Sequence, residues 1–469
     1  MSTPAPPPDG PELWDRVGAI LPHRRCITGD GLRATLRALG EHVPIALAEV
    51  PTGTEVLDWT VPPEWRVRDA AVSRPDGTRV VDAARSPLHL VQYSAPVQAR
   101  LPLSALRAHL HTLPDRPDWI PYRTDYYSGG WGFCLRQRTL DALAEDVGEG
   151  GELDVRIDSD LFEGSLTYGE VVVPGRTGDE ILISAHACHP ALANDNAASL
   201  VVATALARHL LDGPARRHTV RFVFAPGTIG AIAWLAGHPE VVGRVRHGLV
   251  LANLGDAGSL TYKQTRGGTL DGALPVDRAV VSAAREVGVD VDVRPFDPFG
   301  YDERQYGSPG FDLPVGRLTR TPHGEYPEYH TSADDLDLVR PEALAESLAV
   351  LVRVVERLDA SSPATGRPAT RRDARAAPRR PAAAPHGPDR RYCNRAPFGE
   401  PQLGRRGLYH TADGVPLGAD VQAAILWVLN LSDGRHSLHD VSGRSGLPSA
   451  TVEAAAARLL EADLLDALP

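Results

Sequence analysis

Short apolar runs alternate with longer segments that repeat apolar residues at helical spacing through the middle of the chain. Continuous apolar runs at 219–225 and 248–254 are typical of strands buried on both faces. Helical spacing covers 12–20, 31–39, 200–211, 276–287 and 341–358. Because strands that alternate with helices form doubly wound sheets, we predict an α/β fold with a mostly parallel sheet.

A different pattern interrupts this alternation near the start of the chain. Between residues 45 and 122, short segments are separated by Pro and Gly-Thr turns, and 74–78 reads Arg-Pro-Asp-Gly-Thr, a hairpin signal. We therefore predict a small β domain over 45–122, inserted into an α/β domain built from 11–44 and 123–359.

A linker and a separate tail domain follow the α/β domain. Residues 360–394 are mainly Ala, Pro and Arg, a composition that cannot form a core, so we predict a disordered linker. Three helical segments follow at 421–429, 438–443 and 450–462, a layout typical of a winged-helix-like domain over 395–469. Acidic Glu453, Glu461 and Asp463 outnumber the single Arg458 in the last helix, so we expect no nucleic acid as partner.

Composition narrows the classes of protein that fit. The net charge of -11 disfavours broad binding to nucleic acid or acidic membranes. No apolar run approaches the roughly 18 residues of a membrane span, so we expect no membrane partner. Four cysteines without a Cys-x-x-Cys pair, and residues 1–10 without a signal-peptide pattern, favour reduced thiols and a cytoplasmic location.

Side chains that can bind a metal cluster where one apolar strand ends and a helix begins. Residues 184–199 read SAHACHPALANDNAAS, with His186, His189 and Asp195 between the apolar run 180–183 and the helix at 200–211. Imidazole and carboxylate suit zinc, and open α/β sheets bind ligands at the carboxyl ends of their strands. We predict a zinc site here; the alternative is that these histidines are structural.

Four motifs resemble one bacterial family in order along nearly the whole chain: HACHPALANDN, PGTIGAIAWL, YDERQYGSPGFDLPVG and RTPHGEYPEYHTSADD. This aminopeptidase-like family is similar to zinc aminopeptidases of the bacterial leucyl aminopeptidase type. The resemblance implies a zinc-exopeptidase fold with an inserted β domain and a winged-helix tail. It also implies that His186, Asp195, Asp256 and His330 occupy metal-ligand positions.

The sequence departs from the aminopeptidase pattern where those enzymes carry a Glu-Glu pair that supplies a metal ligand and the general base. Here that place reads Gly-Thr-Ile-Gly at 227–230. We predict Glu303 as a relocated base, with Glu325 and Glu328 next; the alternative for Glu303 is an ion pair with Arg304 or Arg320. The predicted substrate contacts are His189, Asn194, Tyr301 and Asp302. His189 could instead be a ligand or support one, and Cys188 could be a ligand or a packed thiol.

These observations lead to one main hypothesis and two others. The main hypothesis is a zinc-dependent hydrolase that cleaves an amide bond of a small aminoacyl or short peptide-like substrate, in polysaccharide or natural-product metabolism. Alternatively, the missing Glu-Glu pair marks a catalytically degenerate scaffold that binds a peptide or sugar. The tail would recruit a peptide or partner chain, or join two copies as a homo-oligomer.

Overall fold

The body of the molecule is organised around an eight-stranded mixed sheet. The computed structural model describes residues 8–361, 389–410 and 417–468. The strand order is β1-β10-β12-β11-β13-β16-β14-β15, and the four pairs β12–β11, β11–β13, β13–β16 and β14–β15 are parallel. The predicted α/β sheet is thus confirmed. Its strands are β1 (Ala46–Pro51), β10 (Ser165–Val173), β11 (Glu180–His186), β12 (Thr219–Ala225), β13 (Val245–Leu251), β14 (Leu260–Lys263), β15 (Val291–Arg294) and β16 (Val315–Thr319).

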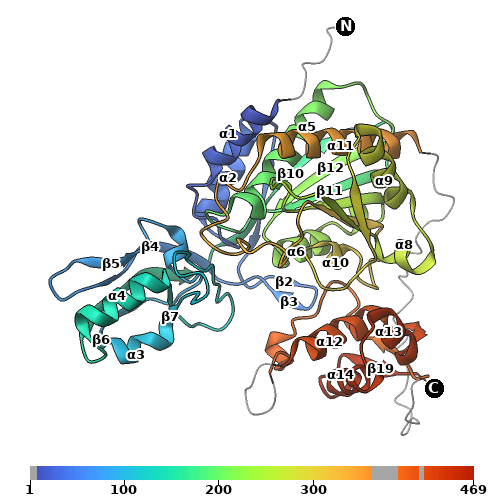
Figure 1. Cartoon of the computed structure of the whole chain (residues 1–469). Helices are drawn as coiled ribbons and strands as arrows, with labels where there is room; N and C mark the ends of the chain where they lie inside the picture. Colours follow the sequence, from blue (N-terminus) through green and yellow to red (C-terminus); the bar gives the residue numbers. More distant parts are fainter. Residues whose placement is uncertain (1–7, 362–388, 411–416, 469) are drawn as a thin grey trace.

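Helices cover both faces of this sheet, which explains why its central strands are continuously apolar (Figure 1). All seven residues of β11 are buried. One core joins the first face to α1 (Gly10–Ile20), α2 (Asp30–Gly40), α5 (Ser199–Asp212), α9 (Pro275–Val287) and α11 (Pro341–Ala360). A second core joins the other face to α6 (Ile229–Gly237), α7 (Pro239–Val242) and α10 (Glu303–Tyr306).

A second, four-stranded sheet in the order β5-β4-β9-β6 stands apart from the large one. Its strands are β4 (Glu64–Ser73), β5 (Arg79–Asp82), β6 (Val97–Pro102) and β9 (Glu152–Phe162), accompanied by the hairpin β2 (Glu55–Val56) and β3 (Trp59–Thr60), α3 (Leu103–Leu106), β7 (Leu110–His111), β8 (Phe133–Cys134) and α4 (Gln137–Val147). We call residues 55–162 the insert. The predicted limits of 45–122 differ because β1 joins the large sheet and β9 joins the small one. Alternation along a strand does not say which sheet it joins.

The tail, residues 389–468 with the gap given above, contains the three predicted helices and a small sheet β18-β17-β19. These elements are β17 (Arg391–Asn394), α12 (Ala419–Leu431), β18 (Asp433–Ser437), α13 (Leu438–Ser445), α14 (Ser449–Glu461) and β19 (Leu465–Ala467). β17 belongs to this sheet, so the tail begins before residue 395. Most of the predicted linker, 362–388, lies outside the described residues.

The tail lies against the body beside the segment that carries α8 (Arg266–Asp271) (Figure 1). Buried Arg266 donates to Asn430 Oδ1 at 2.9 Å and approaches Asp433 at 3.2 Å. At the hairpin, Trp59 Nε1 donates to the carbonyl of Glu400 at 2.7 Å. Tail and body are therefore joined by specific polar contacts. None of the helices in the described part combines the length and the apolar character of a membrane span.

Candidate metal centre

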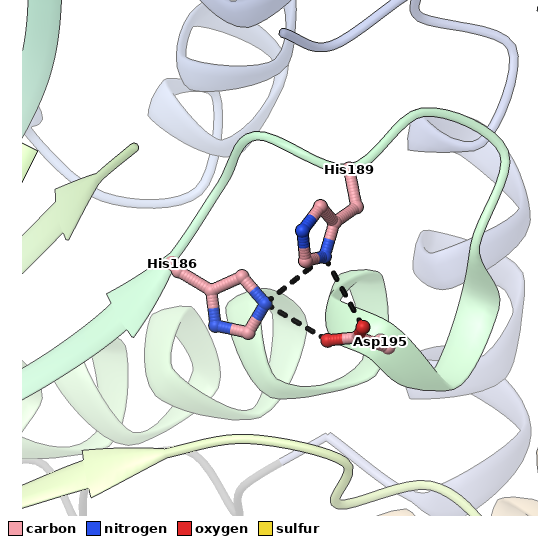
Figure 2. A group of neighbouring side chains, drawn as sticks. All are labelled: His186, His189 and Asp195. Atoms are coloured by element: carbon pink, nitrogen blue, oxygen red, sulfur yellow. Dashed lines mark hydrogen bonds and ion pairs between the residues drawn. The ribbon is translucent and has the colours of Figure 1, made fainter. Parts of the chain in front are cut away.

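The candidate site forms at the carboxyl end of the central strand β11. The strand ends at His186, and the chain then turns through residues 187–192 before the short helical segment Ala193–Ala198 leads into α5. This turn brings His189 and Asp195 back over His186 (Figure 2). The local fold thus follows from an apolar run that ends at a histidine and is followed by Pro190 and a helix.

Three side chains converge closely enough to bind one ion. His186 Nε2 lies 2.8 Å from Asp195 Oδ1 and 3.2 Å from His189 Nδ1. His189 Nδ1 lies 3.2 Å from Asp195 Oδ2 (Figure 2). Tetrahedral ligands with zinc bonds of 2.0–2.1 Å lie about 3.3 Å apart. One ligand atom from each of the three side chains lies within 4.8 Å of the other two, so the cluster fits a single zinc-sized cation.

His330 adds a fourth polar atom from a distant part of the chain. Its Nε2 lies 3.0 Å from Asp195 Oδ2. Both atoms are buried, yet among the described residues neither has a hydrogen-bond partner of acceptable geometry. Buried polar atoms that face each other without hydrogen bonding are costly unless another group satisfies them. A cation in the cluster would do so, which supports a metal site on the residues present.

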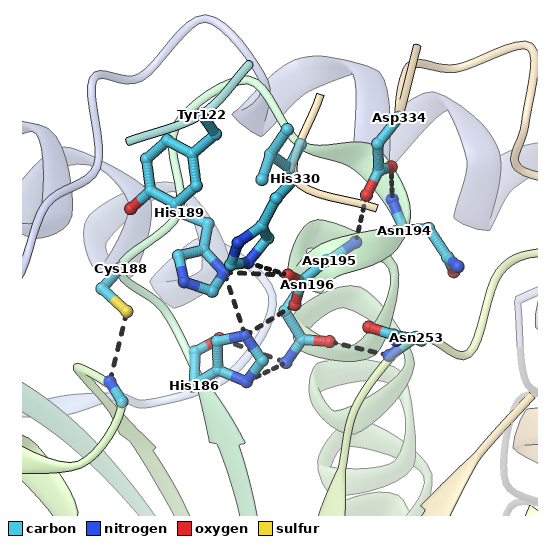
Figure 3. Close-up of polar contacts among 12 residues, drawn as sticks. Tyr122, His186, Cys188, His189, Asn194, Asp195, Asn196, Asn253, His330 and Asp334 are labelled. Atoms are coloured by element: carbon cyan, nitrogen blue, oxygen red, sulfur yellow. Dashed lines mark hydrogen bonds and ion pairs between the residues drawn. The ribbon is translucent and has the colours of Figure 1, made fainter. Parts of the chain in front are cut away.

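Backbone and amide contacts fix the Asp195 loop in place (Figure 3). Asp334, fully buried, accepts hydrogen bonds from the backbone N–H of Asn194 at 2.6 Å and of Asp195 at 3.0 Å. Asn196 Nδ2 lies 3.2 Å from His186 Nδ1 and donates to the carbonyl of Leu251 at 3.1 Å. Such supporting contacts orient ligand side chains before a metal binds.

The pKa values of His189 and Asp195 depend strongly on each other. Burial opposes a charged His189, but the nearby Asp195 carboxylate outweighs burial and holds the His189 pKa well above its usual value. Burial likewise opposes the Asp195 charge, and His189 with the other two imidazoles holds the Asp195 pKa well below its usual range. Positive charge is thus favoured at this spot, whether it comes from a proton or from a cation.

Aromatic rings line the cluster on two sides. Tyr301 stacks on His186, with ring centroids 4.9 Å apart. Tyr122, from the insert, meets His189 and His330 edge-on at 5.2 and 5.0 Å (Figure 3). The insert therefore contributes a wall to the site, and Tyr301 remains a predicted substrate contact.

Asp256, predicted as a ligand, does not join the cluster. Its Oδ1 accepts from the Thr321 hydroxyl and the Gly258 N–H at 2.7 Å each, and its Oδ2 accepts from Asn194 Nδ2 at 2.9 Å. Asn253 lies nearer the end of β13: its backbone N–H donates to Asn196 Oδ1 at 3.1 Å. Asp256 follows the strand by several residues, and the intervening turn directs its carboxylate to these hydrogen bonds.

Asn194 is also not free to contact a substrate. The residue is fully buried, and its amide is used on both sides. The Gly255 N–H donates to its Oδ1 at 2.8 Å, while its Nδ2 donates to Asp256. Asn194 thus ties the Asp195 loop to the segment after β13, so its predicted role as a substrate contact is replaced by a structural one.

Glu303 is an ion-paired structural carboxylate in this geometry and a poor base. It is fully buried, and its Oε1 lies 2.6 Å from Lys263 Nζ and 3.3 Å from Arg317 Nη1. Burial would raise its pKa, but the two cations lower it to about 2. The ion-pair alternative therefore describes Glu303, although its partners are not the neighbouring arginines considered from sequence.

Asp302, by contrast, has the properties of a proton acceptor. It is 3% exposed, and burial raises its pKa to about 7. Its Oδ1 accepts from the Thr228 N–H at 2.7 Å, at the place where the aminopeptidase pattern has its Glu-Glu pair. A Cβ on the preceding Gly227 would lie 3.8 Å from His186 Cβ, so this position borders the cluster. Cys188 accepts from the Gly227 N–H at 3.2 Å, as a packed thiol would.

Several site residues have no distinctive sequence signal. Tyr122 lies in a loop of the insert, far in sequence from the histidines it contacts. Asp334 ends the motif His-Thr-Ser-Ala-Asp at 330–334, and that spacing could have pointed to it. Lys263 and Arg317 lie within the short strands Leu-Thr-Tyr-Lys and Val-Gly-Arg-Leu-Thr, where one charged residue in an otherwise uncharged strand is the hint of a buried ion pair.

Comparison with known families and proteins agrees with this architecture. The family model described as a domain of unknown function (DUF4910) matches residues 14–361, and a winged helix-turn-helix model matches 390–467. A relative from Clostridium acetobutylicum, named a polysaccharide biosynthesis protein with an aminopeptidase-like domain, is 37% identical over 459 residues. That match covers 97% of this chain and 96% of the relative.

Solved structures show the same fold. A crystal structure of a protein from C. acetobutylicum named as a peptidase aligns with 98% of this chain and 96% of its own, at 36% identity and a TM-score of 0.71. A zinc aminopeptidase from Bacillus subtilis aligns with 76% of this chain and 97% of its own, at 14% identity and a TM-score of 0.55, which shows likeness of fold alone. The predicted resemblance is thus confirmed: the chain belongs to the DUF4910 family, an aminopeptidase-like α/β domain followed by a winged helix.

Proposed function

We propose that the protein is a zinc-dependent hydrolase that cleaves an amide bond of a small aminoacyl or peptide-like substrate. The observation that carries this proposal is the spacing of His186, His189 and Asp195 at the end of β11, together with the unpartnered atoms Asp195 Oδ2 and His330 Nε2. The fold of zinc aminopeptidases and the aminopeptidase-like name of the relative support it. That relative's name also supports a substrate from polysaccharide metabolism.

In this proposal the three ligands would hold one zinc and leave a position open. Bound zinc supplies a Lewis acid and a water of lowered pKa. His330, whose side chain is 34% exposed, lies at the mouth of the cluster and contacts the substrate or the fourth position. Tyr301 and Tyr122 exclude water from the two sides of the imidazoles.

Asp302 is the carboxylate that we assign to proton transfer. A general base works best when its pKa lies near the working pH, and burial brings Asp302 to about 7. The Thr228 N–H holds one of its oxygens, which leaves the other to accept a proton from water. Thr228 itself cannot ionise near neutral pH, so Asp302 from the opposite loop substitutes for the missing glutamate.

Metal analysis tests the proposal directly. Protein purified without chelator should contain about one zinc per chain, lost in His189→Ala and Asp195→Ala but retained in Asp256→Asn, the matched control outside the cluster. A panel of aminoacyl amides should be turned over by the wild type and not by His189→Ala. Protein without bound metal would contradict the proposal.

A second candidate is a catalytically inactive binding scaffold. It is favoured by one observation: residues 227–230 read Gly-Thr-Ile-Gly where the zinc aminopeptidases that the sequence resembles carry a Glu-Glu pair. In that case zinc would bind without turnover of any amide in the panel, and Asp302→Asn would leave ligand affinity unchanged.

A further inference from the structure

A second site forms where the body meets the tail. A cavity of about 450 Å³ lies between them, within the 300–1,000 Å³ typical of small-molecule sites. The body supplies β14, β15 and the loops around residues 295–299 and 322–325, while the tail supplies α12 and α13. Apolar surface comes from Phe296 and Phe299 on one side and Trp427 and Leu431 on the other.

Cationic side chains dominate the polar part of this cavity. Five basic residues line it against two carboxylates: Lys263, Arg266, Arg294, Arg317 and Arg444 against Asp297 and Glu325. Two of these arginines are already neutralised, because Arg266 pairs with Asp312 and Asp433, and Arg294 pairs with Asp292 and Glu325. Lys263, Arg317 and Arg444 remain, and they determine the net charge of the cavity.

Lys263 and Arg317 share a single carboxylate, which leaves one positive charge over. Both cations are at least 95% buried, and both approach the same oxygen of Glu303. Arg317 Nε is buried without a hydrogen-bond partner among the described residues. A buried guanidinium donor without a partner is costly, and because Arg317 lines the cavity, an anion there would lie beside this guanidinium and balance its charge.

Arg444 adds a further cation from the tail. It is exposed at the end of α13 and forms no ion pair with any residue that the structure describes. The tail therefore contributes both positive charge and apolar surface, so the cavity is complete only when the tail lies against the body.

The cavity is linked to the candidate metal centre by aromatic rings. The Arg317 guanidinium lies 5.5 Å from the centre of the Tyr301 ring, and Tyr301 stacks on His186. His323 lines the cavity and meets Tyr301 edge-on at 5.2 Å. A ligand in the cavity would thus be separated from the metal cluster by one layer of side chains.

We propose that the cavity between body and tail binds a small organic anion, a carboxylate or phosphate attached to an apolar or aromatic group. The anion is held by Arg317 and Arg444, and the apolar part packs on Phe296 and Trp427. Lys263 contributes only its charge, because its three N–H donors serve the carbonyls of Asp297 and Phe299 and the Glu303 carboxylate. That this ligand is the remote end of the hydrolase substrate rests on the proposed function; binding itself does not.

Titration calorimetry on the full chain tests this inference with three probes of similar size: phenyl phosphate, benzoate and the neutral benzyl alcohol. Saturable binding of either anion at one site per chain, with no binding of the alcohol, is the expected result and identifies which anion is preferred. Failure of both anions to bind would overturn the proposal.

Variants locate the binding. Arg444→Ala should weaken the anion about 3–10-fold, and Arg317→Lys, which keeps the charge but loses the planar fork, about 10-fold or more. Arg435→Ala, an exposed arginine of the same tail outside the cavity, should change nothing. Equal affinity in all three variants would overturn the site.

One further variant separates this inference from the proposed function. Asp195→Ala lacks the metal cluster, so an anion bound in the cavity should keep its affinity within about twofold. Loss of anion binding in that variant would mean that the probe binds the metal centre, which overturns the cavity as the site. A protein without zinc that still binds the anion would contradict only the hydrolase.

Discussion

Replacing Glu303 by glutamine tests most sharply whether this residue stabilises the fold or performs chemistry. At an effective dielectric of about 20, an ion pair at 2.6 Å to Lys263 has a gross attraction of about 6 kcal/mol, and one at 3.3 Å to Arg317 about 5 kcal/mol. Repulsion between the two cations and their desolvation offset much of this. Breaking a buried pair costs about 3–5 kcal/mol, and that is the loss we expect for Glu303→Gln.

The pH dependence of that loss adds a second signature. Burial lowers the Lys263 pKa to about 8 even with Glu303 present, so without the carboxylate Lys263 should release its proton on folding near neutral pH. The unfolded chain keeps this proton up to about pH 10.4, so the folded variant binds fewer protons. Between about pH 6 and 8 the variant should therefore regain stability relative to wild type, by up to about 1.4 kcal/mol per pH unit.

Urea unfolding followed by circular dichroism measures the effect. With a slope of about 3 kcal/mol per M, the midpoint should fall by about 1–1.7 M. Glu325→Gln is the matched control, because its pair with Arg294 is exposed and should contribute less than about 1 kcal/mol. An unchanged midpoint together with loss of amide hydrolysis would refute the reasoning, since Glu303 would then act in the chemistry.

Three further predictions follow from the site and the tail. Asp302→Asn should lower amide hydrolysis about 100-fold or more with zinc content unchanged, and wild-type activity should rise with pH through about 7, because the ionised carboxylate is the active form. Asp334→Ala removes the acceptor for the Asp195 loop and should weaken zinc binding about 10–100-fold in equilibrium dialysis. Arg266→Ala removes buried contacts to the tail, so limited proteolysis should separate tail and body several-fold faster.

Each of these has a result that contradicts it. A rate independent of pH between about 6 and 8, or full activity in Asp302→Asn, would remove that carboxylate as the base. Wild-type zinc affinity in a correctly folded Asp334→Ala would show that the loop is held without it. For the tail, Arg435→Ala is the control, and proteolysis of Arg266→Ala at the control's rate would mean that other contacts maintain docking.

The elements that sequence predicts well are those whose pattern depends only on burial. The apolar run 180–183 identifies β11, because both faces of the sheet are covered. The proline at the start of 341–358 identifies the first turn of α11, because the fixed backbone angle of proline suits that position. Strand β9 shows the limit: it lies within 123–359, the range predicted for the α/β domain, but it pairs with β4 and β6 of the insert. Pairing depends on long-range contacts that local pattern does not contain.

The same limit applies to the site. His186 and Asp195 could be predicted because their loop follows a buried strand directly, and the structure brings them together with His189. The surroundings of Asp256 and Glu303 could not be predicted, because a carboxylate near the site in sequence can be directed to hydrogen bonds or ion pairs elsewhere. The direction in which a side chain points depends on the conformation of the surrounding turn, which the local sequence pattern does not show.

The contact between Trp59 and Glu400 has a consequence for synthesis of the chain. The two residues are 341 positions apart, and at 5–20 residues per second the ribosome needs about 17–70 s to make the second after the first. During that interval the hairpin lacks its partner, and Arg266 lacks its partner Asn430 for the shorter time needed to make 164 further residues. Nascent body and finished protein therefore differ in exposed surface: a chain that terminates before the tail leaves the Trp59 indole N–H without its acceptor, and Arg266 keeps Asp312 but lacks Asn430 and Asp433.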